Sequence, residues 1–124
     1  MRYFLLFITA AVLLLSNGCY YDNEEELYPN SFCDTVNISY SGAIEPIVIA
    51  KCATPGCHVA GGSGSGDFTT YAGVIAKIQN NGPFLASVLG SPDAIPMPPS
   101  GSPQLRSCEV RKIELWIAAG APND

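Results

Sequence analysis

The sequence predicts an all-α domain of three to four short helices joined by loops rich in glycine and proline. Apolar residues recur at helical spacing in residues 40–50, 67–80 and 102–119. Glycine concentrates in residues 59–66 and proline in residues 91–102, between those segments. A chain of 124 residues has the length of one domain, so these helices should share one core.

Residues 1–18 have the pattern of a secretory signal peptide. Arg2 supplies the positive charge, residues 3–15 are apolar except for one threonine, and residues 16–18 are small or polar and precede Cys19. The apolar run is shorter than the roughly 20 residues that a membrane-spanning helix needs. The alternative is an uncleaved N-terminal anchor.

Residues 19–36 predict an acidic tether rather than a packed element, because they lack an apolar period. Residues 37–124 follow the signal peptide and the tether, and they contain all of the predicted helices, so we expect them to form the folded domain. The formal net charge of the whole chain is −5, with 6 Lys and Arg against 11 Asp and Glu. No basic cluster occurs, so we expect no nucleic-acid partner.

The first helix is expected over residues 40–50, with Ser41 as its N-cap. Pro46 lies close enough to the start to be tolerated in the first turns. One apolar face is formed by Ile44, Ile47 and Val48.

A second helix is expected over residues 67–80, with Thr69 or Thr70 near its N-cap. Its apolar stripe consists of Tyr71, Val74, Ile75 and Ile78. Residues 84–89 predict one more short helical stretch.

The clearest helix is expected over residues 102–119. Ser102 would cap it, Pro103 suits its first position, and Gly120 followed by a proline would end it. Trp116 lies beside the apolar face of this helix, so we expect it to be a core residue.

Residues 52–58 contain two cysteines followed directly by a histidine. Cys-x-x-Cys-His is the attachment signature of c-type haem, and here Cys52, Cys57 and His58 repeat it with two additional residues in the spacer. Each thiol would bond one vinyl group of the porphyrin, and the histidine would bind the iron. Pro55 and Gly56 favour a tight turn within the spacer.

Met97 is the candidate for the second axial iron ligand. His58 is the only histidine, and apart from the initiator Met97 is the only methionine. It lies among prolines that stiffen residues 91–102, which lowers the entropy cost of holding a weak thioether ligand. The alternative is that Met97 only fills space, as methionines commonly do.

The chain has five cysteines, an odd number for an exported protein. If two cysteines hold haem and Cys19 carries lipid, as the lipobox resemblance described below implies, Cys33 and Cys108 remain as a candidate disulfide. The alternative is that Cys108 is a free buried thiol.

Three other sites compete with an electron-carrying haem. A haem enzyme or gas sensor would need an open sixth position and polar distal groups, but no second histidine exists. A structural zinc site could join the thiols and imidazole of residues 52–58 to Cys33 or Cys108. Cys52 and Cys57 could also form a simple redox disulfide.

Residues 40–123 resemble small membrane-anchored c-type cytochromes of the Bacteroidetes lipoprotein kind, within the class I cytochrome c fold. The resemblance rests on residues 52–58, the glycines that follow, residues 97–99 and residues 113–122. It implies short helices around one covalent haem c, with the N-terminal helix crossing the C-terminal one.

The residues before Cys19 resemble a lipobox, in which the cysteine is lipidated and becomes the new N-terminus. The acidic residues after it resemble the signal that sends some such lipoproteins to the cell surface. The resemblance therefore implies an exported electron carrier, not an enzyme. It would be anchored to a bacterial membrane, facing the periplasm or the surface, with redox proteins as partners.

Overall fold

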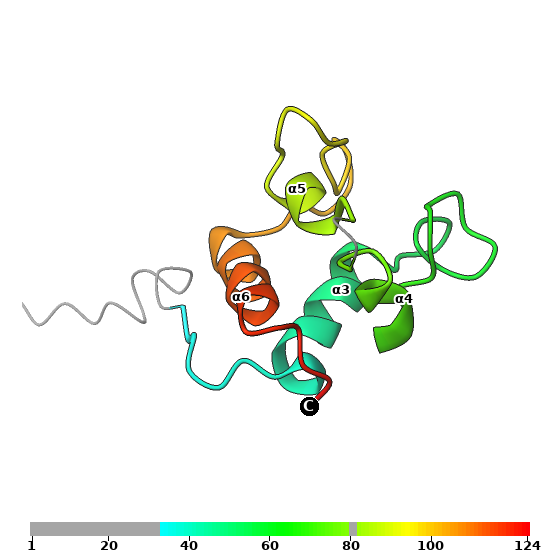
Figure 1. Cartoon of the computed structure of the whole chain (residues 1–124). Coiled ribbons are helices and arrows are strands. Elements are labelled where there is room, and N and C mark those ends of the chain that lie inside the picture. The colour runs from blue at the N-terminus through cyan, green and yellow to red at the C-terminus, as the bar shows by residue number, and fades with distance from the viewer. Residues whose placement is uncertain (1–32, 80–81) are drawn as a thin grey trace, which may run out of the picture. The chain divides into compact units, whose positions relative to one another are not determined.

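A computed structural model describes residues 33–79 and 82–124, and every regular element in these two ranges is a helix (Figure 1). The elements in chain order are η1 (Tyr40–Ile44), α3 (Glu45–Lys51), α4 (Tyr71–Ile75), α5 (Phe84–Val88) and α6 (Ser107–Ala118). The all-α prediction is thus confirmed for these ranges. The predicted signal peptide, Cys19 and most of the acidic tether lie outside the described residues.

The first predicted helix is present as two consecutive pieces, the π-helical turn η1 and the α-helix α3. Its cap is Ser39 and not Ser41, so that prediction was wrong. Ser39 has extended backbone, and its hydroxyl accepts a hydrogen bond from the amide of Gly42 at 3.0 Å. A cap needs that non-helical conformation, whereas Ser41 lies inside the first turn. Pro46 lies in the first turn of α3, as expected.

Helix α4 is much shorter than the predicted residues 67–80. Thr70 caps it, through its hydroxyl and the amide of Gly73. The carboxylate of Asp67 accepts hydrogen bonds from the amide and hydroxyl of Thr69, and this local turn competes with helix. After Ile75 the hydrogen bonds change to the tighter turn pattern, for example from the amide of Lys77 to the carbonyl of Val74.

Helix α5 confirms the expected short stretch near residues 84–89. Helix α6 confirms the C-terminal helix but begins at Ser107, so Ser102 and Pro103 are not its cap and first residue. The side chain of Gln104 donates to the carbonyls of Pro99 and Ser102 at 3.0 and 2.9 Å, which holds these residues in the preceding loop.

The start of α6 is set by Arg106 and Glu109. The amide of Arg106 donates to the Glu109 carboxylate at 2.7 Å, which is one half of a capping box. The helix ends as predicted, since Gly120 has a φ of +94°, which glycine adopts without strain.

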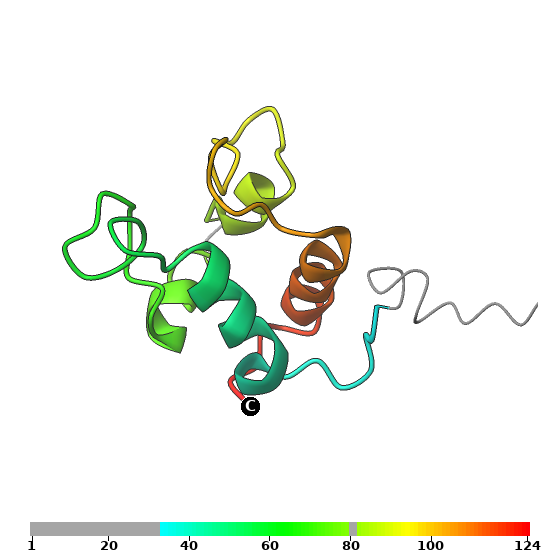
Figure 2. The same ribbon diagram turned by 180° about the vertical axis from the view of Figure 1, so that it is seen from behind.

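The core includes the contact of η1 with α6 (Figure 2) and extends to buried residues of α3, α4 and α5. The ring centroids of Tyr40 and Trp116 are 5.6 Å apart, and the indole N–H of Trp116 donates to the Pro122 carbonyl. Trp116 is 1% exposed, so its predicted core role is confirmed. The largest fully buried side chains are Trp116, Ile44, Ile113, Val48 and Val74.

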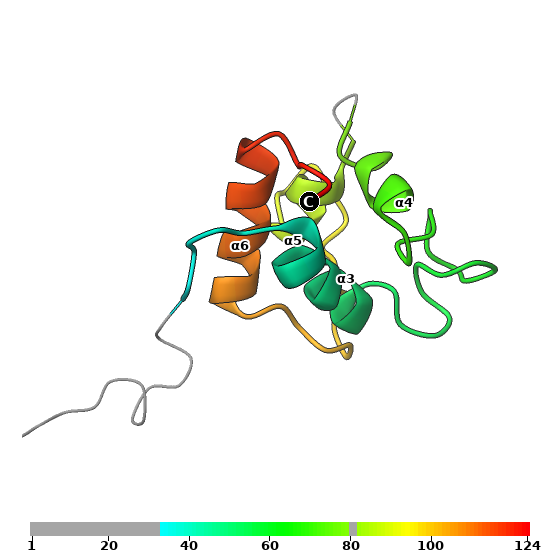
Figure 3. The same cartoon turned by 90° about the horizontal axis from the view of Figure 1, so that it is seen from below.

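The segment that leads into η1 runs beside α6 (Figure 3), and the sulfurs of Cys33 and Cys108 lie at bonding distance there, 2.07 Å. This disulfide joins residues that are 75 positions apart, with Cα atoms 5.4 Å apart. Within residues 33–79 and 82–124, none of the helices combines the length and apolarity required to cross a membrane.

Candidate functional site

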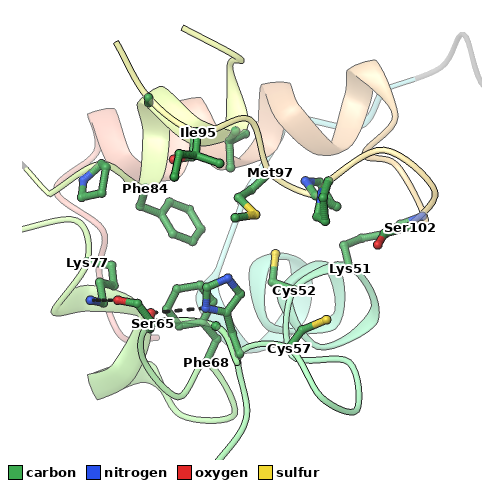
Figure 4. Close-up of a pocket in the computed structure, with 18 of the residues that line it drawn as sticks. Lys51, Cys52, Cys57, Ser65, Phe68, Lys77, Phe84, Ile95, Met97 and Ser102 are labelled. Atoms are coloured by element: carbon green, nitrogen blue, oxygen red, sulfur yellow. Dashed lines mark hydrogen bonds between the residues drawn. The ribbon is translucent and has the colours of Figure 1, made fainter. Parts of the chain in front are cut away.

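A cavity of about 600 Å³ is lined by the four residues that the sequence assigned to haem binding (Figure 4). Cys52 follows the last turn of α3, Cys57 and His58 lie in the next loop, and Met97 comes from the proline-rich loop. These segments are up to 45 positions apart (97 minus 52), so only the fold brings them together. Cofactor sites usually have volumes of roughly 300–1,000 Å³.

The spacer between the two cysteines is a tight turn. The amide of Cys57 donates to the carbonyl of Thr54 at 2.9 Å, and Gly56 has a φ of +83°. Proline in the second position and a positive-φ glycine in the third form the pattern of a type II turn. The amide of His58 then donates to the carbonyl of Cys52 at 3.2 Å, so the histidine returns to the end of α3.

The imidazole of His58 is held from two sides. Its Nδ1 lies 3.3 Å from the carbonyl oxygen of Ser65, which can only accept, so in the neutral imidazole the proton belongs on Nδ1 and the lone pair on Nε2. One face of the ring stacks on Phe68. A hydrogen-bonded Nδ1 is the usual support for a histidine that binds a metal through Nε2.

Gly64 leaves the space that this imidazole occupies. A Cβ atom at position 64 would lie 2.7 Å from Nδ1 of His58, closer than real contacts allow. The amide of Gly64 also donates to the carbonyl of Cys57 at 3.2 Å, which ties the glycine-rich loop to the cysteine motif. The glycine-rich run therefore supports the histidine, in addition to forming the expected loop.

Both motif cysteines are free thiols. Cys52 is buried, and this burial, followed by the nearby Cys57, raises the pKa of the Cys52 thiol to about 11. Cys52 thus keeps its proton at neutral pH. Figure 4 shows the sulfur of Cys52 directed toward the sulfur of Met97 across the cavity, with Cys57 beside Cys52 on the lower wall.

Met97 is held by its backbone and half-buried. Its amide donates to the carbonyl of Ser87 at 3.0 Å, which joins the proline-rich loop to α5. The Gln104 side chain, which donates to two carbonyls of the same loop, fixes the loop on the other side of Met97. The methionine is therefore presented by a braced loop.

Three contributors to this site were not predicted from the sequence. Ser65 and Gly64 lie within the glycine-rich residues 59–66, and neither was predicted to hold the histidine. Phe68 lies in the predicted second helix but was not part of its predicted apolar stripe. The ring of Phe68 also contacts that of Phe84, with centroids 5.7 Å apart, and both rings line the cavity. The close sequence spacing of Gly64, Ser65 and Phe68 after the histidine is the one signal that could have suggested them.

The donor set fits a covalently attached haem. Figure 4 shows the thiols of Cys52 and Cys57 on one side of the cavity and the thioether of Met97 facing them, and His58 lines the same cavity. Haem is a large, flat and mainly apolar group, and Phe68, Phe84 and Val88 supply apolar walls for it. Zinc fits less well, because Cys33 and Cys108 are joined to each other and cannot serve as thiolate ligands.

Comparison with known proteins returns no match for this chain to a protein-family model, to a curated protein or to a solved structure.

Proposed function

We propose that this protein is an electron carrier that holds one covalent haem c, with His58 and Met97 as the axial iron ligands. In this proposal the described domain has a class I cytochrome c-like fold. The supporting observation is that Cys52, Cys57, His58 and Met97, from separate segments, line a single cavity of about 600 Å³. The packing of η1 on α6 agrees with the helix contact that such a fold requires.

The cysteines would attach the group without an added oxidant. Each thiol would hold the haem through one thioether bond to a vinyl group, because addition of S–H across a C=C bond releases no group and needs no oxidant. The type II turn sets the separation of the two thiols on the cavity wall.

When bound, the haem would supply a one-electron couple between ferrous and ferric iron. The role of the protein is to orient His58 through Ser65 and Phe68, and to present Met97 from a braced loop. With both axial positions filled, no position is left for a substrate at the iron. This favours a carrier over a haem enzyme or gas sensor, for which no distal histidine exists in the sequence.

The proposal extends to the cellular context. Cys19 would carry lipid after removal of residues 1–18, and the acidic segment up to residue 36 would tether the haem domain to a bacterial membrane. The domain would face the periplasm or the cell surface. Its partners would be a donor and an acceptor protein that exchange single electrons with it.

Attachment is tested by the intact mass of the mature protein from a host with haem-attachment machinery. We expect one haem on the wild-type chain, loss of covalent haem in a Cys52→Ser, Cys57→Ser double variant, and full retention in Cys33→Ser. Haem that washes out of the wild-type protein with acidic organic solvent would contradict covalent attachment. Zinc and no iron in the wild-type protein would support the structural metal site instead.

A further inference from the structure

Lys77 and Ser65 form a polar end of the cavity that the thiols, imidazole and thioether do not use. The ammonium of Lys77 donates to the hydroxyl of Ser65 at 2.6 Å, and both residues line the cavity. Lys77 follows α4, and Ser65 lies in the glycine-rich loop. The hydrogen bond therefore joins two segments at the rim.

Both partners of this pair are positioned by other contacts. The alkyl chain of Lys77 lies against Gly66, where a Cβ atom would come within 2.9 Å of its Cε. The carbonyl of Ser65 is the acceptor for His58 Nδ1. One residue thus orients the imidazole through its backbone and the lysine through its side chain.

The charge of Lys77 has no anionic partner within the described residues. The ion pairs there join Arg106 to Glu109 and Arg111 to Glu114. The other charged groups that line the cavity are Lys51, next to Cys52, and the exposed carboxylate Asp93. Lys51 acts on Glu109, whose pKa its positive charge helps to lower.

The thiols define where the two ends of a haem would lie. In haem the two vinyl groups occupy one half of the porphyrin and the two propionates occupy the other half. Thioethers to Cys52 and Cys57 would therefore direct the propionates away from these residues. Figure 4 shows Lys77 and Ser65 on one side of the cavity, and Cys52, Cys57 and Lys51 on the other.

We infer that Lys77, held by Ser65, binds a haem propionate by a charge-assisted hydrogen bond. This inference rests on the proposed function. The propionate would supply the anionic partner that Lys77 lacks within the described residues. The hydroxyl of Ser65 would hold the ammonium in position at the cavity. Lys51 has the same charge but lies at the thioether end, which makes it the matched control.

The test is resonance Raman spectroscopy of the mature haem protein in wild type, Lys77→Gln, Lys51→Gln and Ser65→Ala forms. The frequency of the propionate bending mode rises with the strength of hydrogen bonding to the carboxylate. We expect a shift to lower frequency in Lys77→Gln, a smaller shift in the same direction in Ser65→Ala, and none in Lys51→Gln. Ser65→Ala keeps the carbonyl that holds His58, so the axial ligands should not change.

The possible failures are distinct. Attached haem with the same propionate mode in wild type and Lys77→Gln would overturn the propionate assignment and leave the electron-carrier proposal standing. A shift in Lys51→Gln alone would also overturn it, because it would place the propionate at the other end. Wild-type protein that carries no haem would overturn the proposed function, and this inference with it.

Discussion

The imidazole of His58 lies flat on the ring of Phe68, with ring centroids 4.2 Å apart and an angle of 4° between the planes. Phe68 is 6% exposed and belongs to the hydrophobic core. The amide of Phe68 also donates to the carbonyl of His58 at 2.9 Å. The candidate iron ligand is therefore oriented by the core itself, through a residue ten positions further along the chain.

Replacing Phe68 with leucine should destabilise the fold and leave the imidazole of His58 less well oriented. We expect unfolding to be easier by about 1–2 kcal/mol, because an aromatic contact and part of the buried volume are lost. Acid converts the ferric haem protein from low-spin to high-spin when His58 is lost from the iron. This transition should occur at a higher pH in the variant, because its imidazole is less well oriented. Urea denaturation and an absorption titration measure these two effects.

Phe84→Leu is the matched control for this variant. Phe84 is 5% exposed and contacts Phe68, but it makes no ring contact with His58. It should lose a similar amount of stability and keep the wild-type acid transition. The same acid-transition pH in wild type, Phe68→Leu and Phe84→Leu would show that stacking on Phe68 does not support His58 as a ligand.

Met97→Ala should leave the haem attached, because both thiols and His58 are retained. The weak band near the red end of the ferric spectrum that reports the iron–sulfur bond should disappear, and the reduction potential should fall, since thioether ligation raises it. Pro99→Ala, in the same loop, should keep the band. An unchanged low-spin spectrum in Met97→Ala would exclude Met97 as the ligand.

The Cys33–Cys108 disulfide should stabilise the domain without affecting the haem. It closes a loop between residues 75 positions apart, and a disulfide typically stabilises a fold by about 2–4 kcal/mol. Cys33→Ser should lower the free energy of unfolding, measured by urea denaturation, by this amount and keep full haem attachment. The Cys33→Ser, Cys108→Ser double variant should match the single variant, and no loss of stability in either would show that the bond is not formed.

Glu109 should make the domain sensitive to acid. Its burial, the largest effect, raises its pKa, but hydrogen bonds from Arg106 and the charges of Arg106 and Lys51 outweigh this and leave the pKa lowered. A lowered pKa in the folded state stabilises the fold above the ordinary carboxyl range, and this contribution is lost as the pH falls through the folded-state pKa.

Glu109→Gln should therefore unfold about 1 kcal/mol more easily than wild type at pH 7, where a charge-assisted hydrogen bond becomes a neutral one. The difference should be smaller at an acidic pH below the folded-state pKa of Glu109, where the wild-type carboxylate is protonated. Glu114→Gln, which removes a surface pair at 3.7 Å, should change stability by less than about 0.5 kcal/mol at either pH. Urea midpoints at both pH values decide between these outcomes.

Helical periodicity was sufficient to predict the helices but not their ends. Residues 40–50 and 84–89 were close to the observed elements, because apolar spacing reports which face is buried. The ends depend on side-chain hydrogen bonds that several residues compete to make. Asp67 with Thr69 delays α4, and Gln104 keeps Ser102 and Pro103 out of α6.

In the candidate site, the sequence predicted the residues that would bind haem but not the residues that support them. Cys52, Cys57, His58 and Met97 were found from residue type and spacing, and the fold brings them to one cavity. Their supports were not found, because they act through features that sequence patterns do not encode. Ser65 uses its backbone carbonyl, and Gly64 contributes its backbone amide and the absence of a side chain.

The electron-carrier proposal is tested most directly by a redox titration of the mature protein, followed by its visible spectrum. The account predicts one reversible one-electron transition, with low-spin iron in both oxidation states and no reaction of the ferrous form with carbon monoxide. A colourless protein would contradict the presence of haem. High-spin iron that binds carbon monoxide would show an open axial position, and would contradict ligation by both His58 and Met97.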